Sequence, residues 1–305
     1  MPLRQILVKE KVDILHMRSR MPAWIGYIAW KMILPAKRPV LVTTFHGFYS
    51  VNRYSAIMTQ GDGVIAVSKS IKNHIREKYG RSQNVQLIFR GVDVDAFCPE
   101  NVSVERKAKL QKRWNIPTDR PLLMLPGRLS KLKGQEVFLE SLLKVKNKNY
   151  FAVLVGDIED NPGYTALLRE FIRNHGLDDR VSLVGHCDDM PAAFMLADIV
   201  LSTSSLEPEA FGRTSVEAMA MGKPVIATAH GGSMETVLPG ENGWLVRPSA
   251  PQELALAIDE ALSVDRSTLQ KLGEAGRNRV HECFTSTAMC EHTLKFYRYL
   301  LGEQP

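Results

Sequence analysis

Two glutamates with seven residues between them, Glu209 and Glu217, lie on either side of Phe211-Gly212-Arg213. A helix is predicted to begin near Arg213 and to end at the Gly-Lys-Pro stop that follows it. Backbone N–H groups in the first turn of a helix have no partner within the helix, so they can bind a phosphate. Glu209 is then placed to accept hydrogen bonds from sugar hydroxyls, and Glu217 from a ribose diol.

The same two carboxylates have simpler explanations. Glu217, about one turn inside the helix, favours the helix dipole as an acidic residue near its start. Glu209 can be a solvated loop residue.

The segment GRLSKLKG carries a second chemical signal. Arg128 follows a predicted strand, and Lys133 comes just before a helix predicted to open at Gly134. A diphosphate can be bound by such a combination of a guanidinium group, an ammonium group and the free backbone amides at a helix start. A solvated basic loop is the alternative.

The elements that position these residues alternate between short β-rich runs and helix-length segments. Such alternation predicts parallel sheets covered by helices. After a polar stretch at residues 100–120 the rhythm restarts, which predicts two α/β domains, residues 1–110 and 111–285. Ligands of open parallel sheets bind beyond the carboxyl ends of the strands, where His46, Gly127, Arg128, Gly185 and His186 lie. The predicted strands are 12–16, 40–46, 63–68, 85–89, 121–127, 151–157, 181–186, 198–203, 224–228 and 243–246.

The composition is that of an ordinary globular protein: 305 residues, 45% hydrophobic and 24% charged, with a formal net charge of +6. The charge favours an anionic ligand. No run of five basic residues and no nucleic-acid-binding motif is present, so nucleic acid is not expected as a partner. Four cysteines without a Cys-x-x-Cys pair indicate a reduced, cytoplasmic protein.

Two segments bear on membranes. Lys9, Glu10 and Lys11 interrupt the N-terminal apolar run, so no signal peptide is expected. The segment Pro22–Arg38 combines three aromatic residues with Lys31, Lys37 and Arg38. It is predicted to be a helix that packs on a sheet, or alternatively a patch that meets acidic lipid.

Asp93-Val94-Asp95 has the spacing of a metal-binding Asp-x-Asp motif. It follows a predicted strand and a glycine, where turn chemistry also favours aspartate. Spacing alone does not make a site for a hard cation, so no metal is expected.

Several motifs in order resemble retaining glycosyltransferases of family 4, which have the GT-B fold. The E-x7-E pair at Glu209 and Glu217, the GKPVIAT segment with the later Gly231-Gly232, and GRLSKLKG are similar to that family's donor-domain motifs. TTFHGFYS, IAVSKSIKNHI and FRGVDVDAF resemble its segments in the first domain and at the approach to the second.

The resemblance implies two Rossmann-like domains facing a cleft, with the last helix, residues 286–305, crossing back to the first domain. It implies a nucleotide-sugar donor held by residues 111–285 and an acceptor held by residues 1–110. Glu209, His46, Arg128 and Lys133 are the implied catalytic residues. The implied donor-binding residues are Gly127, Arg128, Lys133, Gly185, His186, Glu209, Ala210, Phe211, Gly212, Arg213, Thr214 and Glu217.

The implied reaction is metal-independent hexosyl transfer with retention, and it needs neither a cofactor nor a protein nucleophile. The implied acceptor is a glycan or glycolipid of the cell envelope, as in lipopolysaccharide biosynthesis. The enzyme would then be cytoplasmic or peripheral at the inner face of the membrane. For His46 alone, filling a strand end is the simpler explanation.

The family begins with a strand and a Gly-rich loop that this sequence lacks before residue 12. At about 30 residues per βα unit, roughly 60 residues are expected to be missing from the first domain. A truncated relative that binds nucleotide or a partner chain without turnover is therefore the alternative function.

Overall fold

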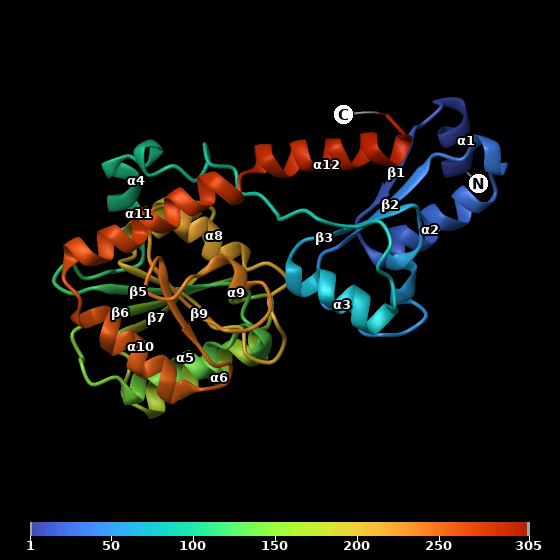
Figure 1. Ribbon diagram of the computed structural model, residues 1–305. Helices are drawn as coiled ribbons and strands as arrows, with labels where there is room; N and C mark the ends of the chain where they lie inside the picture. The colour runs from blue at the N-terminus through green and yellow to red at the C-terminus, as the bar shows by residue number, and fades with distance from the viewer. Residues whose placement is uncertain (1, 304–305) are drawn as a thin grey trace. The chain divides into compact units, whose positions relative to one another are not determined.

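The computed structural model describes residues 2–303. The chain folds into two compact units. The first comprises Met1–Gly91 and Ser286–Pro305, and the second comprises Val92–Thr285. Each unit contains one parallel sheet flanked by helices (Figure 1). The predicted α/β class is therefore confirmed for both.

The first unit has a four-stranded sheet in the order β1-β2-β3-β4. Helix α12 packs on this sheet through Phe296, which belongs to one buried hydrophobic cluster with Val42, Ile65 and Ile88. The elements are α1 (Pro2–Lys9), β1 (Ile14–Met17), α2 (Arg20–Lys31), β2 (Val40–Phe45), β3 (Gly63–Ala66), α3 (Lys69–Tyr79), β4 (Val85–Leu87) and α12 (Ser286–Leu301), with 3₁₀ turns at Pro35–Lys37 and Ser55–Thr59.

The second unit has a six-stranded sheet in the order β10-β9-β8-β5-β6-β7. One hydrophobic core packs α5, α6 and α10 against the sheet, and Figure 1 shows α8 and α11 on the opposite side. The elements are α4 (Val104–Arg113), β5 (Leu122–Pro126), α5 (Gln135–Lys144), β6 (Phe151–Val155), α6 (Pro162–Asn174), β7 (Val181–Gly185), α7 (Met190–Leu196), β8 (Ile199–Ser202), α8 (Arg213–Ala220), β9 (Val225–Thr228), α9 (Ser233–Thr236), β10 (Gly243–Val246), α10 (Pro251–Ser263) and α11 (Arg266–Cys283), with 3₁₀ turns at Pro99–Asn101 and Lys131–Lys133.

The division between the units lies at Gly91 and Val92, whereas the sequence-based boundary lay at residue 110. The polar stretch that suggested the later boundary contains helix α4, whose N-cap Ser103 accepts a hydrogen bond from the Arg106 N–H. Arg106 in turn donates to Asp189 at 2.6 and 2.9 Å. Only Leu110 is buried in helix α4, which explains why the segment is polar. The ion pair between Arg106 and Asp189 nevertheless joins it to the second unit.

The connection between β2 and β3 contains only the short 3₁₀ turn Ser55–Thr59 and no α-helix. Four of the five residues of this turn are buried, and Arg20 lies over the Tyr54 ring at 5.5 Å. Burial on nearly every side leaves no amphipathic stripe, which is what a longer surface helix would need.

Helix α2 presents two different faces. Its small residues Ala23, Gly26 and Ala29 are buried, and a Cβ on Gly26 would come within 2.6 Å of the Met17 sulfur. On another side, large apolar residues are exposed at helical spacing: Met21 at 61%, Ile25 at 45%, Ile28 at 49% and Met32 at 52%. We call these four residues the α2 apolar stripe. Within residues 2–303, no helix combines the length and apolar character needed to cross a membrane.

The aromatic residues of α2 do not belong to this stripe. Trp24 and Trp30 are partly buried and donate to the carbonyls of Tyr54 and Pro39 at 3.0 and 2.7 Å. Arg38 lies over the Trp30 ring at 4.7 Å. These aromatic side chains therefore pack within the first unit, in agreement with the prediction that this segment is a helix packed on a sheet.

Candidate functional site

The second unit has a cavity of about 330 Å³ beyond the carboxyl ends of its strands. From β5 the sheet continues through β6 and β7 on one side and through β8, β9 and β10 on the other. Open α/β sheets bind ligands at such a switch point, which here lies between β5 and β8. Five of the predicted donor-binding residues line this one cavity: Gly127, Arg128, His186, Thr214 and Glu217.

Arg128 reaches the cavity from the loop after β5. Its side chain is exposed, and it forms no ion pair with any carboxylate in the described part of the chain. The loop itself is fixed because the buried Gln135 donates from Nε2 to the Arg128 carbonyl at 3.0 Å. Arg128 thus combines a fixed backbone with a guanidinium group that no carboxylate of the described residues neutralises, and this combination suits an anionic ligand.

Lys133 and Glu209 form an ion pair beside the cavity. Ser204 Oγ donates to the same Glu209 oxygen, Oε1, at 2.5 Å. Burial alone would raise the pKa of the Glu209 carboxyl, but the charge and hydrogen bond of Lys133 and the hydrogen bond of Ser204 hold that pKa below its ordinary value. Glu209 is therefore an anion at neutral pH.

This ion pair adjoins the cavity wall without being part of it. Neither Lys133 nor Glu209 is among the residues that line the cavity. A Cβ on Gly127 would lie 3.8 Å from Cγ and Cδ of Lys133, so the lysine stem passes directly behind that wall.

The loops after β5 and β8 are locked together at Gly134. Gly134 has φ +70°, and a Cβ there would lie 2.0 Å from the Thr203 carbonyl oxygen, so only glycine fits. Thr203 Oγ1 donates to the carbonyl of Lys133 at 3.0 Å. This contact brings Lys133 and Glu209 together although 76 residues separate them in the sequence.

Helix α8 begins beside the cavity. Its N-cap is Gly212, at φ +85°, and no side chain caps its first turn. Thr214 and Glu217 line the cavity from this helix, and Arg213 Nε donates to Glu217 Oε1 at 2.6 Å. The Glu217 side chain is only 13% exposed, whereas that of Arg213 is 64% exposed. The helix start therefore offers uncapped amides and a shielded carboxylate on one side.

The remaining predicted residues have mainly backbone roles in the structure. Phe211 is 4% exposed and packs edge-on against Phe284 at 5.5 Å, so its side chain belongs to the core. Ala210 is partly exposed in the loop before α8. The Gly185 carbonyl accepts from the Gly156 N–H at 3.0 Å, and the exposed His186 lies 2.9 Å from an Asp188 oxygen.

Several residues of this region were not among the predicted site residues. Asp157 and Cys187 line the cavity, and Ser204 holds Glu209. Asp157 ends a predicted strand segment, so its position at a strand end was a usable signal. Cys187 and Ser204 directly follow the predicted strands 181–186 and 198–203, so they carried the same signal.

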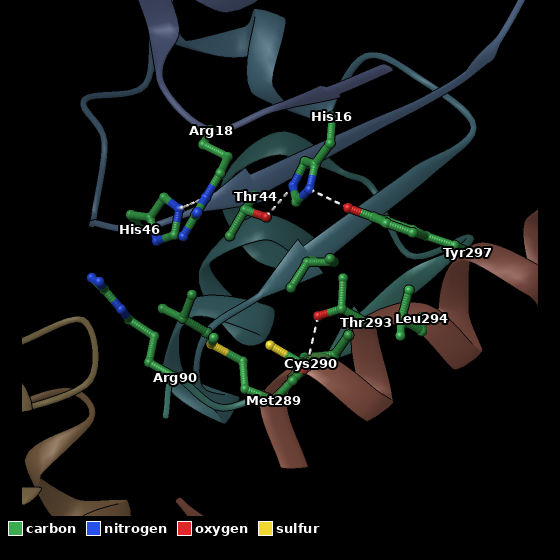
Figure 2. A pocket seen from close by; sticks show the side chains of 13 residues that line it. His16, Arg18, Thr44, His46, Arg90, Met289, Cys290, Thr293, Leu294 and Tyr297 are labelled. Carbon is green, nitrogen blue, oxygen red and sulfur yellow. Dashed lines mark hydrogen bonds between the residues drawn. The ribbon is translucent and has the colours of Figure 1, made fainter. Parts of the chain in front are cut away.

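His46 lies in the first unit and lines a separate cavity there, of about 350 Å³ (Figure 2). Burial lowers the pKa of His46 to about 4, with further contributions from the charges of Arg90 and Arg18 and from His16. Its ring is therefore neutral at pH 7. Arg18 Nε donates to His46 Nε2 at 3.4 Å, and the buried Nδ1 has no hydrogen-bond partner.

Asp93 takes part in a turn. Its Oδ1 accepts from the N–H groups of Asp95 and Ala96, both at 3.0 Å. Across residues 2–303, no three His, Cys, Asp or Glu side chains gather as metal ligands would.

Two family models match the chain. The model described as glycosyl transferases group 1 matches residues 106–279, and the model described as glycosyltransferase family 4 matches residues 1–96. A relative from Bacillus anthracis, N-acetyl-alpha-D-glucosaminyl L-malate synthase, is 27% identical over 93% of this chain and 74% of its own length.

Two solved structures show the same architecture. A glycosyltransferase from Rickettsia africae is 35% identical, with a TM-score of 0.91 over 99% of this chain and 80% of that one. The Anabaena protein HepE, solved with UDP and glucose, is 27% identical, with a TM-score of 0.84 over 96% of this chain and 80% of that one. Since the group 1 model spans more than half of the sequence, this chain belongs to the glycosyl transferases group 1 family and has the GT-B fold of the family 4 enzymes.

Proposed function

We propose that this glycosyltransferase moves a hexosyl group from a nucleotide sugar to a cell-envelope glycan or glycolipid, with retention of anomeric configuration. The observation that carries the proposal is the cavity of the second unit, where Arg128, Thr214 and Glu217 converge from different elements. The complex of the similar HepE with UDP and glucose supports a nucleotide-sugar donor.

Different residues around this cavity bind different parts of the donor. Arg128 and the uncapped amides of Gly212, Arg213 and Thr214 bind the diphosphate, because anions favour guanidinium groups and helix starts. Glu217 accepts hydrogen bonds from the ribose diol. The backbone of Gly185 and His186 contacts the base.

The Lys133–Glu209 pair serves the reacting end of the donor. The bond between the anomeric carbon and the diphosphate oxygen breaks, and an acceptor hydroxyl bonds to that carbon on the same face. The hydroxyl proton passes to the departing diphosphate. Arg128, Lys133 and the helix amides stabilise the charge on the leaving group, so no metal ion is required. Glu209 stabilises the positive charge that develops on the sugar.

Binding of one nucleoside diphosphate without metal is the first expected result. Calorimetry with UDP, GDP and ADP should reveal one preferred nucleotide, whose affinity changes less than about twofold when a chelator is added. Arg128→Ala should weaken it about tenfold, near the lower end for a charged hydrogen bond because Arg128 is exposed. Arg173→Ala, which removes an exposed arginine from α6, is the matched control and should have no effect.

Three outcomes would contradict parts of this proposal. If no nucleotide binds, the donor assignment fails. If chelation abolishes binding and Asp93→Asn does the same, the Asp-x-Asp motif is a metal site. Nucleotide binding without transfer or hydrolysis of any nucleotide sugar would instead support the non-catalytic relative.

We further propose that the α2 apolar stripe rests on an acidic membrane surface, placing the enzyme on the cytoplasmic side. The exposed Lys31 and Lys37 lie on and just after the same helix and would meet lipid phosphates. A glycolipid acceptor would then be reached at the surface where it resides.

The double variant Ile25→Ser/Ile28→Ser should bind anionic vesicles at least about tenfold more weakly than the wild type. Each half-exposed isoleucine contributes roughly 1 kcal/mol when it enters the interface. Co-sedimentation with phosphatidylglycerol vesicles measures the change. Leu167→Ser, which alters an exposed leucine of α6 (53% exposed), is the control, and equal binding by all three proteins would refute the membrane role.

A further inference from the structure

The cavity of the first unit has a construction that the donor site does not explain. It lies at the carboxyl ends of the four strands, since His16, Thr44, Val67 and Ile88 line it from β1 to β4 or the residues that follow them. Helix α12 closes the other side (Figure 2). Every lining residue belongs to the first unit.

One end of this cavity is cationic. Figure 2 shows Arg18 and Arg90 on the same side of the pocket as His46. None of the residues that line the cavity is an aspartate or glutamate, and Arg18 has no carboxylate partner in the described range 2–303. Two guanidinium groups without a lining carboxylate create a positive potential that attracts an anion.

The neighbouring histidines do not add charge at neutral pH. Burial, followed by the charge of Arg18, lowers the pKa of His16 to about 4, and His46 is neutral for similar reasons. Each ring nitrogen of His16 lies within hydrogen-bond distance of a hydroxyl, Tyr297 Oη at 2.5 Å and Thr44 Oγ1 at 2.6 Å. These contacts fix the floor of the cavity and leave the two arginines as its charged groups.

The other end is apolar. Ile65 and Ile88 line it from the sheet side, and Met289, Leu294 and Tyr297 line it from α12. The Leu294 side chain remains 52% exposed although it borders the cavity. An apolar wall opposite two cations matches a molecule that has an anionic group and a hydrocarbon portion.

We propose that this cavity binds the acceptor through a phosphate or carboxylate held between Arg18 and Arg90, with an apolar portion of the acceptor against α12. The acceptor is then an anionic amphiphile and not a neutral oligosaccharide. At about 350 Å³, the cavity is near the lower end of ligand pockets, so it holds the anionic group and a short apolar segment. Only the identification of this ligand as the acceptor rests on the proposed function.

Cys290 provides a direct measurement, because it lines this cavity and Cys283 does not, while both thiols are exposed. Octyl phosphate, at concentrations where it is monomeric, should slow alkylation of Cys290 by iodoacetamide and leave Cys283 unaffected. Inorganic phosphate should protect at least tenfold more weakly, and octanol should not protect. Peptide mass spectrometry reads both thiols in the same full-length sample.

Arg18→Gln and Arg90→Gln should each weaken octyl phosphate at least tenfold, whereas Arg53→Gln, at an exposed arginine outside the cavity, should not. Leu294→Glu tests the apolar wall at a position exposed enough to tolerate the change, and it should also abolish protection. Equal protection by octanol would make the cavity a simple apolar slot, and equal protection by inorganic phosphate would make it a bare anion site. Unchanged protection in both arginine variants would refute the proposal.

Nucleotide binding separates this inference from the proposed function. The preferred nucleoside diphosphate should bind Arg18→Gln as it binds the wild type, and it should not protect Cys290. Protection of Cys290 by that nucleotide would assign the cavity to the donor and overturn the inference. Octyl phosphate binding by a chain that binds no nucleotide would support the anionic site while removing the proposed donor.

Discussion

Glu209→Gln is expected to slow sugar transfer about 100- to 1000-fold while the affinity for the nucleoside diphosphate stays within about threefold of the wild type. The rate loss is that expected when one preorganised electrostatic contact to the transition state is removed. Glutamine keeps the size of the side chain and can still accept from Ser204, so the change isolates the negative charge.

The structure gives two reasons for this separation of rate from affinity. Glu209 lies outside the residues that line the nucleotide cavity, so the nucleotide is not expected to contact it. Its carboxylate is kept ionised by Lys133 and Ser204 in a largely buried position, where a charge acts strongly on a developing oxocarbenium ion. An interaction that strengthens only in the transition state changes the rate more than the ground-state affinity.

Single-turnover transfer and nucleotide calorimetry on the same variant test this expectation. Ser204→Ala, which removes one hydrogen bond to Glu209 but keeps its charge, is the graded control and should slow transfer by less than about tenfold. If Glu209→Gln lost nucleotide affinity as severely as rate, the carboxylate would act by placing Lys133 for the diphosphate.

The local parts of this architecture could be predicted from the sequence. Strand Gly243–Val246 was predicted with its observed bounds, because a short β-rich run ends at clear turn signals. Arg128 was placed at a ligand-binding edge because it follows a parallel strand, and the resemblance to family 4 implied that Thr214 and Glu217 share its site. Each of these predictions rests on a motif whose own residues are close together in the chain.

The parts that could not be predicted depend on contacts between distant segments. The sequence suggested that Lys133 binds the diphosphate and Glu209 the sugar, but it gave no sign that the two pair with each other. That pairing requires the glycine at 134 to let the backbone touch Thr203. The cavity of the first unit likewise combines Arg18 with Met289 and Leu294, which helix α12 brings to the sheet.

Glu217→Gln is expected to weaken the nucleoside diphosphate about 10- to 100-fold while leaving inorganic pyrophosphate binding unchanged. The Glu217 side chain is 13% exposed and lines the same cavity as Arg128, so its hydrogen bonds to a ribose diol form in a shielded place. Loss of a charged hydrogen bond there costs about 1.5–3 kcal/mol. Pyrophosphate has no ribose, so it reports only on Arg128 and the helix amides.

A competing role for Glu217 is to hold Arg213, whose Nε donates to it at 2.6 Å. That pair joins residues four apart on a helix, an arrangement that contributes only a few tenths of a kcal/mol when the arginine is as exposed as this one. Arg213→Ala should therefore change nucleotide affinity less than about threefold, and Glu140→Gln, at an exposed glutamate of α5, should change nothing. Calorimetry that found Arg213→Ala as damaging as Glu217→Gln, or pyrophosphate weakened along with the nucleotide, would show that the carboxylate positions the arginine and does not bind the ribose.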